Sequence, residues 1–341
     1  MTIYSTLNYH RLILLVRRGL LGAALATCAV AWGAGTAVAE TANTYPSKTV
    51  KVIVGFPPGG SADVLARILC QKLSVLYKQS FIVENKPGAG GTIGASVVAH
   101  SAPDGYTLLL GVTASQTIAP SMYKSLAYNA AKDFAPITLL ANIPIVLEIN
   151  PSVPAKNVKE LISLAKSANP PLTFGSSGVG AIPHLTGEIF QKAAGVKLLH
   201  VPYKGSTPAL TDLIAGRVQI MFDNLTSSLP FIQTDKLRVL AIAGPTRIAA
   251  LPNVPTLTES GVPMSVRSWF GLLAPAGTPQ EIVDRLSKDI GTQMKTSETR
   301  KTLSGLGAEL ATTTPEAFAE IIRADTKQWA DTVQLTGIKA Q

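Results

Sequence analysis

Short apolar segments alternate with amphipathic ones along most of the chain. The segment TVKVIVGF, residues 49–56, is rich in β-branched residues and predicts a buried strand. A helix is expected after Ser61, because apolar residues then recur at helical spacing at Val64, Leu65, Ile68, Leu69, Leu73 and Leu76. SFIVENK and YTLLLGV predict two more strands, and GAGGTIGASVVAHS turns through glycines into a helix between them. Such alternation predicts parallel sheets covered by helices on both faces.

The pattern restarts near residue 150, after the long extended stretch ITLLANIPIVLEIN. Helices are expected at NVKELISLAKSA, IPHLTGEIFQKAAG and TPALTDLIAG, and strands at LTFGSS, KLLHVPY, VQIMFDN and LRVLAIAG. SWFGLLAPA then leads into the helix PQEIVDRLSKDIGTQM and a final helix from Pro315. We therefore predict an α/β fold with two domains, residues 40–146 with 268–341 and residues 147–267, joined by extended crossings near 143–150 and 265–273. Ligands of open α/β sheets lie outside the carboxyl ends of the strands, which puts the ligand in the cleft between the domains.

The first 39 residues have the pattern of a secretory signal. Arg11, Arg17 and Arg18 precede an uncharged stretch from Gly19 to Ala39, which closes with AVA before Glu40. This predicts export and cleavage after Ala39. An uncleaved membrane anchor is the second interpretation, because the stretch is nearly long enough to span a bilayer. The arginine pair leaves the export route, Sec or twin-arginine, open.

Removal of the signal leaves 302 of the 341 residues, enough for two α/β domains. The formal net charge falls from +9 to +6, because the signal carries three arginines and no acidic residue. The remaining basic residues are scattered, so we expect no nucleic acid partner and only weak steering of anionic solutes. Cys28 leaves with the signal and Cys70 remains alone, which excludes an internal disulfide in the mature chain.

The run FPPGGSAD follows the first predicted strand and carries the clearest chemistry. Its candidate ligand-binding residues are Phe56, Pro58, Gly59, Gly60 and Asp63. Glycines at the start of a helix let a ligand approach the unpaired N–H groups, and the positive end of the helix favours an anion such as a carboxylate. The alternative is a tight structural turn in which Asp63 complements the helix terminus. No lysine or serine completes a nucleotide-binding P-loop.

The run TFGSSGVGAIPHLTGE provides a second loop at a strand end. Ser176, Ser177 and Gly178 precede a helix start and are candidates to bind a carboxylate or carbonyl. A secreted hydrolase that uses Ser177 with His184 is the competing class, although GSSGV does not match the nucleophile motif G-x-S-x-G. His184 and Glu188 stand four residues apart, but without further ligands we expect hydrogen bonding and no metal site.

Two more strand ends repeat this arrangement. The run HVPYKGSTPAL contributes Tyr203, Lys204 and Gly205, and the strand VQIMFDN ends on Asp223 and Asn224. The glycines of NKPGAGGTIGA do not fall as G-x-G-x-x-G, so we expect a structural turn there and no cofactor. Four polar loops that converge at strand ends predict a binding cleft that needs no catalytic group.

Six runs together resemble the Bug-type periplasmic receptors of tripartite tricarboxylate transporters: VIVGFPPGGSADVLAR, VENKPGAGGTIGA, SAPDGYTLLLG, FGSSGVGAIPHLTGEIF, VPYKGSTPALTDLIAGRVQIMFDN and ESGVP with SWFGLLAPAGTP. The resemblance runs from about Tyr45 to the C-terminus.

This resemblance implies a two-domain Venus-flytrap fold, a periplasmic location, a monomer and no enzymatic activity. It implies a small carboxylate ligand, such as a dicarboxylate, tricarboxylate, aromatic acid or acidic amino acid, and either membrane transporter subunits or a sensor ectodomain as partner. It also places residues 56–60, 176–178 and 203–205 around the ligand. The loop GVTASQTIAP adds Thr113, Ser115 and Gln116 as candidates, and we include His184 beside them.

Overall fold

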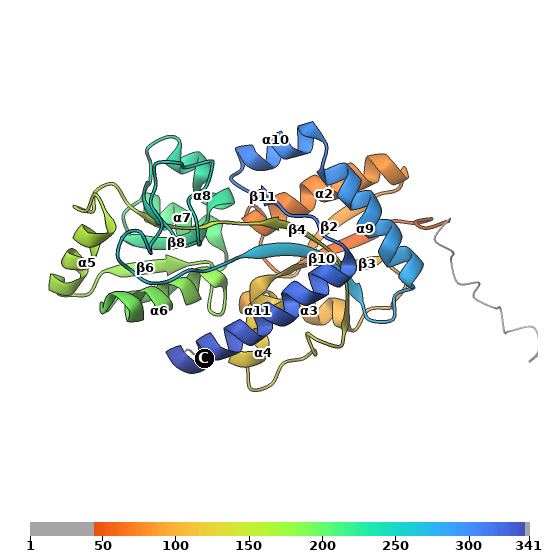
Figure 1. The fold of residues 1–341 in the computed structure, drawn as a ribbon, viewed down its shortest axis with the longest axis horizontal. Helices are drawn as coiled ribbons and strands as arrows, with labels where there is room; N and C mark the ends of the chain where they lie inside the picture. Colours follow the sequence, from red (N-terminus) through yellow and green to blue (C-terminus); the bar gives the residue numbers. More distant parts are fainter. Residues whose placement is uncertain (1–43, 338–341) are drawn as a thin grey trace, which may run out of the picture. The chain divides into compact units, whose positions relative to one another are not determined.

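The computed structural model describes residues 44–337 and contains two β-sheets flanked by helices (Figure 1). The predicted signal, residues 1–39, and Cys28 lie outside the described residues. Within residues 44–337, no helix has the length and apolarity that a membrane crossing requires.

Sheet A has six strands in the order β11, β4, β10, β3, β1, β2. Their bounds are β1 Val50–Val54, β2 Phe81–Asn85, β3 Thr107–Val112, β4 Phe134–Asn142, β10 Trp269–Pro275 and β11 Glu309–Leu310. Side chains alternate between the two faces of β1. Val52 and Val54 join the apolar cluster that contains Leu69 of α2 (Ser61–Tyr77), whereas Ile53 packs with Val98 of α3 (Thr92–Ala99). Helices therefore cover both faces, as the alternation predicted.

Sheet B has five strands in the order β7, β6, β8, β5, β9. Their bounds are β5 Ile145–Ile149, β6 Thr173–Ser176, β7 Leu199–Pro202, β8 Ile220–Asn224 and β9 Arg238–Ile242. Leu147 and Phe222 face the cluster that contains α5 and α6, whereas Val146 and Met221 face α7 and α8. The bounds are α5 Val158–Ser167, α6 Ile182–Ala194, α7 Ser206–Ile214 and α8 Leu225–Ile232.

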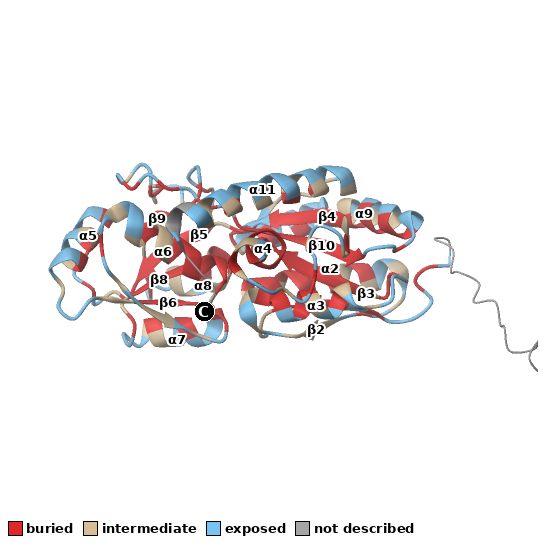
Figure 2. Cartoon of the chain, turned by 90° about the horizontal axis from the view of Figure 1, so that it is seen from below, coloured by how far each residue is buried: buried red, intermediate tan, exposed pale blue. Residues whose placement is uncertain are grey.

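The remaining helices and helical turns lie between β2 and α3, after β3, or toward the C-terminus. They are α9 Gln280–Met294, α10 Ser297–Gly305, α11 Pro315–Thr336, α4 Ala119–Met122, the 3-10 turn η1 Ala89–Gly91 and the π-helical turn η2 Ala114–Ile118. Figure 2 shows buried strands in both sheets and exposed outer faces on α5 and α11. The sequence pattern did not indicate η2, α4, α8, α10 or β11, because these segments are short or lack a clear apolar period.

Both sheets are mixed, whereas the alternation pattern predicted parallel sheets. β1 pairs in parallel with β2 and β3, but β10 lies antiparallel between β3 and β4, and β5 lies antiparallel between β8 and β9. β5 and β10 are the strands that the chain enters on passing from one sheet to the other without an intervening helix, and β11 also pairs in antiparallel fashion with β4. The stretch ITLLANIPIVLEIN divides at residues 143–144 into β4 and β5, and Ile143 N donates to Ser268 O (2.8 Å), so the two crossing segments lie side by side.

Candidate functional site

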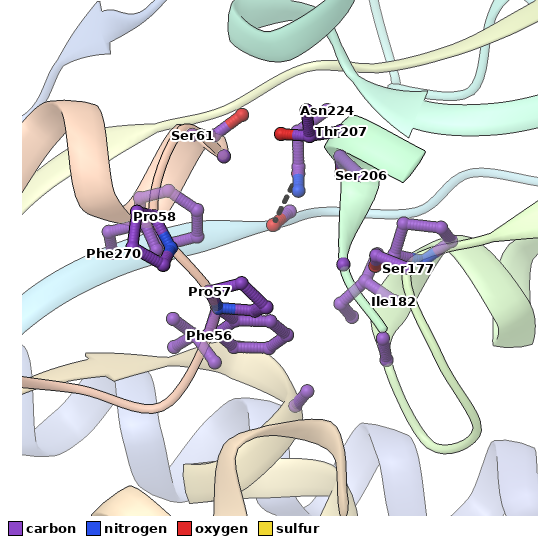
Figure 3. A pocket seen from close by; sticks show the side chains of 18 of the residues that line it. Phe56, Pro57, Pro58, Ser61, Ser177, Ile182, Ser206, Thr207, Asn224 and Phe270 are labelled. Carbon is purple, nitrogen blue, oxygen red and sulfur yellow. Dashed lines mark hydrogen bonds between the residues drawn. The ribbon is translucent and has the colours of Figure 1, made fainter. Parts of the chain in front are cut away.

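One cavity of about 70 Å³ lies where loops of sheet A meet loops of sheet B (Figure 3). Its walls come from the β1–α2, β6–α6 and β7–α7 loops, the ends of β3 and β8, and the start of β10. The lining residues are Phe56, Pro57, Pro58, Gly60, Ser61, Ala62, Val112, Ala114, Ser177, Ala181, Ile182, Pro183, Gly205, Ser206, Thr207, Pro208, Asn224, Ser268 and Phe270.

Four helices begin at this cavity. The N-cap residues of α2, α6, α7 and α8 are Gly60, Ala181, Gly205 and Asn224, and all four line the wall. In these four described helices no side chain caps the first turn. Ser61 N of α2 and Leu225 N of α8 donate within the protein, to Ser227 Oγ and Pro144 O. Each terminus still carries roughly half a positive charge, which suits a small anion.

Asp63 holds the β1–α2 loop in shape from within α2. Its Oδ2 accepts from Gly59 N (3.0 Å) and from Arg67 Nε (2.8 Å), and its Oδ1 accepts from Asn85 Nδ2 (3.0 Å). Asn85 also donates to Phe56 O (2.9 Å). Burial alone would raise the pKa of Asp63, but these hydrogen bonds outweigh it and hold the pKa below its ordinary value. The ionised side chain thus anchors the loop, and Asp63 does not line the cavity.

The loops of the two sheets touch each other around the cavity. Ser61 Oγ lies 2.7 Å from Ser227 Oγ of α8, and Ser61 N donates to the same oxygen (3.1 Å). A Cβ added to Gly205 would lie 3.0 Å from Pro57, and one added to Gly59 would lie 3.2 Å from Thr207 Oγ1. The backbone at both glycines has positive φ, +109° and +87°, so glycine fits the turn and the close approach.

Ser177 lines the cavity, whereas its neighbours shape the turn behind it. Ser176 Oγ lies 2.7 Å from His200 Nε2 and accepts from Gly178 N (3.2 Å). His184 Nδ1 accepts from Gly180 N (3.3 Å), and its ring stacks on His200. Burial lowers the pKa of both histidines to about 4, so both are neutral at pH 7. His184 therefore forms its hydrogen bond with the turn, and Ser176, not Ser177, contacts a histidine.

The residues that follow β3 are buried beside sheet A, and their side chains form hydrogen bonds within the protein. Thr113 Oγ1 accepts from Trp269 N (2.9 Å), and Ser115 Oγ donates to Val112 O (3.3 Å). Gln116 is fully buried and lines a different groove, beside α11. Of this region only Val112 and Ala114 reach the cavity wall.

Of the candidate residues at the ends of β7 and β8, some line the cavity and others do not. Gly205 lies at the wall and donates its N–H to Ser177 O (3.2 Å), and Asn224 lines the wall and accepts from Ser268 Oγ (3.4 Å, dashed in Figure 3). Tyr203 donates to Asp212 (2.8 Å), Lys204 is exposed, and neither lines the cavity. Asp223 is buried behind Ser206.

Six of the 19 lining residues are among the candidates predicted from the sequence, so about two-thirds of the wall was missed. Ser61 and Ser206 directly precede predicted helices and Thr207 begins one, so the rule that selected Gly60 and Gly205 also points to these three. Ser268 and Phe270 reach the cavity only because β10 enters sheet A in the antiparallel direction. No local pattern signals that position.

The wall combines polar donors with apolar surface and carries no charged side chain among the described residues that form it. Hydroxyls of Ser61, Ser177 and Ser206 lie near the helix N-termini, and Phe56 and Ile182 supply apolar surface between them (Figure 3). This arrangement can bind a compact anion with an apolar body. In residues 44–337 no three His, Cys, Asp or Glu side chains group as a metal site.

The chain is similar in sequence and fold to known proteins. A family model described as tripartite tricarboxylate transporter family receptor matches residues 65–338. The solved structure of Rpa4515 with adipate, from R. palustris, is 35% identical, covers 86% of this chain and 99% of its own, and superposes with a TM-score of 0.83. The periplasmic binding protein BugD (34% identical, 87% and 100% covered, TM-score 0.82) has the same fold. So does MatC from Rhodopseudomonas palustris with bound malate (33%, 85% and 100%, TM-score 0.79).

Proposed function

This chain belongs to the tripartite tricarboxylate transporter receptor family, and we propose that it captures a small organic carboxylate in the cavity described above and delivers it to a membrane transporter. The observation that carries the proposal is the convergence of four helix N-termini on a wall without charged side chains. Such a site rewards negative charge and compact size without offering a nucleophile or a metal.

The solved relatives support the carboxylate class. Rpa4515 holds adipate and MatC holds malate, and both are small dicarboxylates. In this chain α2 begins on one side of the cavity and α6, α7 and α8 begin on the other, so two anionic groups of one ligand can each meet a helix terminus. Short uncharged donors, namely serine and threonine hydroxyls and backbone N–H groups, form the polar part of the wall, which favours recognition of the carboxylate over recognition of the rest of the molecule.

We also propose that the two sheets belong to two lobes that close on the ligand. Their boundaries lie close to the predicted limits at 146/147 and 267/268, but the first falls before β5, which begins at Ile145. Two features support this: the chain crosses between the sheets at residues 143–144 and 243–268, and the loops already meet through Ser61 and Ser227. The proposal includes a periplasmic monomer, exported by the signal at residues 1–39, that meets transporter subunits. A sensor ectodomain would use the same liganded state.

The hydrogen bonds of the two histidines argue against a serine hydrolase. A serine nucleophile needs a base within hydrogen-bond reach, about 2.6–3.2 Å. In the described residues the hydrogen bond of His184 goes to Gly180, and the short contact between serine and histidine joins Ser176 to His200, away from the cavity wall. Generic ester substrates should show no turnover that depends on Ser177.

A thermal-shift screen tests the ligand class. The panel is malate, adipate, citrate, glutamate and benzoate, with dimethyl adipate, adipamide, glucose and AMP as controls. A ligand at a hundredfold excess over Kd stabilises the folded state by about 2.7 kcal/mol, and each kcal/mol raises Tm by roughly 2–4 °C at this size. At least one acid should raise Tm by about 5–10 °C, and its ester or amide should lose most of the effect. A shift by glucose, or an ester as effective as its acid, would refute the carboxylate class.

A further inference from the structure

Two carboxyl groups are buried together in sheet B, behind the cavity wall. Glu148 of β5 and Asp223 of β8 are both fully buried. The two strands are antiparallel neighbours, with Val146 opposite Asp223 and Glu148 opposite Met221. The two acidic side chains therefore lie on the same face at diagonal positions, which is within reach of long side chains. That face is the one covered by α7 and α8.

The pair lacks partners that could stabilise two negative charges. Within residues 44–337, both oxygens of Glu148, Asp223 Oδ2 and the Thr226 hydroxyl have no partner at hydrogen-bond geometry. The Ser228 hydroxyl of α8 lies near Glu148 and acts to lower its pKa, but burial and Asp223 outweigh this effect. A buried carboxylate without hydrogen bonds or a cation costs several kcal/mol, so the pair keeps a proton instead.

The charged residues on the neighbouring elements are engaged elsewhere. On α7, Asp212 binds Tyr203 and Arg217. On β9, Arg238 donates to the carbonyls of Val153 and Ala155. Helix α8 has no ionisable residue, and α2, which packs on α8, pairs its Asp63 with Arg67.

Burial raises the pKa of both acids. Burial and the neighbouring Asp223 raise the pKa of Glu148 well above its ordinary value. Burial raises the pKa of Asp223 to about 7.

Asp223 is connected to the cavity through one hydroxyl. Ser206 lines the wall at the first turn of α7, and its Oγ lies 2.7 Å from Asp223 Oδ1. An ionised Asp223 can only accept, so it takes the single hydrogen of Ser206 and leaves lone pairs toward the cavity. A protonated Asp223 can instead donate to Ser206 Oγ, which frees the hydrogen of Ser206 to donate to an anion in the cavity.

We propose that Asp223 is a positioning residue which, with Glu148, holds the proton that turns Ser206 into a donor to the ligand carboxylate, so that ligand capture is coupled to uptake of a proton. The proton comes from solvent and ends on Asp223, and no covalent bond of the ligand changes. This inference rests on the proposed function, because it needs an anionic ligand at the cavity wall.

Isothermal titration calorimetry in phosphate and in Tris measures the proton uptake directly, since the two buffers differ in ionisation enthalpy. The probe is whichever acid of the thermal-shift panel binds, titrated between pH 6 and pH 9. We expect the wild-type affinity to fall toward a limit of tenfold per pH unit above the pKa of the pair, with uptake of up to one proton. If no acid of the panel binds, the proposed function fails. Binding without proton exchange and without this slope overturns the inference alone.

Three variants distinguish a role of Asp223 in positioning the Ser206 hydrogen from a purely structural role. Asp223→Asn keeps a permanent donor toward Ser206, so its affinity should stay constant between pH 6 and pH 9 without proton uptake. Ser206→Ala, which leaves the acid pair in place, should bind more weakly and also lose the pH slope. The matched control Asp325→Asn changes another acid of raised pKa, one that accepts from Trp269 Nε1 (2.6 Å) outside the cavity wall, and should keep the wild-type profile. A wild-type slope in Asp223→Asn or Ser206→Ala contradicts the proposal.

An infrared measurement tests the shared proton without any ligand. The ligand-free protein at pH 7 should show the C=O band of a buried protonated carboxyl, and Glu148→Gln with Asp223→Asn should remove it. Absence of the band in the wild type, or stabilisation by NaCl or CaCl₂ that this double variant loses, would assign the pair to a bound cation instead of a proton.

Discussion

The substitution Gly60→Ala places one methyl group at the mouth of the proposed site. Gly60 lines the cavity as the N-cap of α2, with φ −82° and ψ 170°, a conformation open to any residue. A Cβ added there has no atom within 4 Å. The methyl group therefore costs the folded protein no strain and no contact, but it occupies the space that a ligand carboxylate needs to reach the amides of α2.

The two expected effects differ in size. Alanine restricts the unfolded chain, which stabilises the protein by about 0.4–1 kcal/mol, but it is a poorer N-cap than glycine by a similar amount, so Tm should change by no more than roughly 2 °C. Loss of one charge-assisted hydrogen bond costs about 1.5–3 kcal/mol, so affinity for the acid identified by thermal shift should fall roughly 10- to 150-fold.

Calorimetric titration and a thermal melt of the same preparation measure both effects. Gly291→Ala is the matched control, because Gly291 lies in α9 with nothing within 4 Å of an added Cβ and does not line this cavity. It should gain stability and bind normally. Gly59→Val is a less direct test, since positive φ and the contact with Thr207 would strain the loop as well. Unchanged affinity in Gly60→Ala would remove the start of α2 from the binding site.

Three further outcomes follow from contacts around the cavity and in the core. Ser227→Ala removes two hydrogen bonds to Ser61, worth about 0.5–1.5 kcal/mol each, so affinity should fall roughly 5- to 150-fold because these bonds join the two proposed lobes; an unchanged or tighter complex by titration would contradict this. Gly205→Ala and Gly261→Ala both place a Cβ at positive φ and should lower Tm in a thermal melt, but only Gly205 faces the proline loop, so calorimetry should show weaker binding in that variant alone. Cys70 is buried and its pKa is raised to about 12, so iodoacetamide at pH 8 should label it, by mass spectrometry, only after unfolding.

A comparison of the predicted loop residues with the cavity wall shows which site residues a local sequence pattern can predict. Glycines and hydroxyls at the start of a helix can be found in the sequence, because the helix period and the preceding strand locate the terminus; Gly60, Ser177 and Gly205 were found this way and lie at the wall. Asp63 satisfied the same rule, yet its side chain turns to Arg67 and Asn85. The choice between ligand and internal partner depends on which groups lie nearby in space, and Asn85 arrives from a different strand.

The sequence by itself determined the strand and helix order, the family, and the loops at which helices begin, since each depends on short runs whose backbone preferences and apolar periods are local. Only the tertiary structure decided that Phe270 completes the cavity wall and that Glu148 lies beside Asp223. Both results depend on antiparallel pairing of strands distant in the chain, where the register of β10 against β3 and of β5 against β8 selects the neighbours. That register is fixed by the packing of whole sheets against their helices, because a slip of one residue would turn every buried side chain to the opposite face.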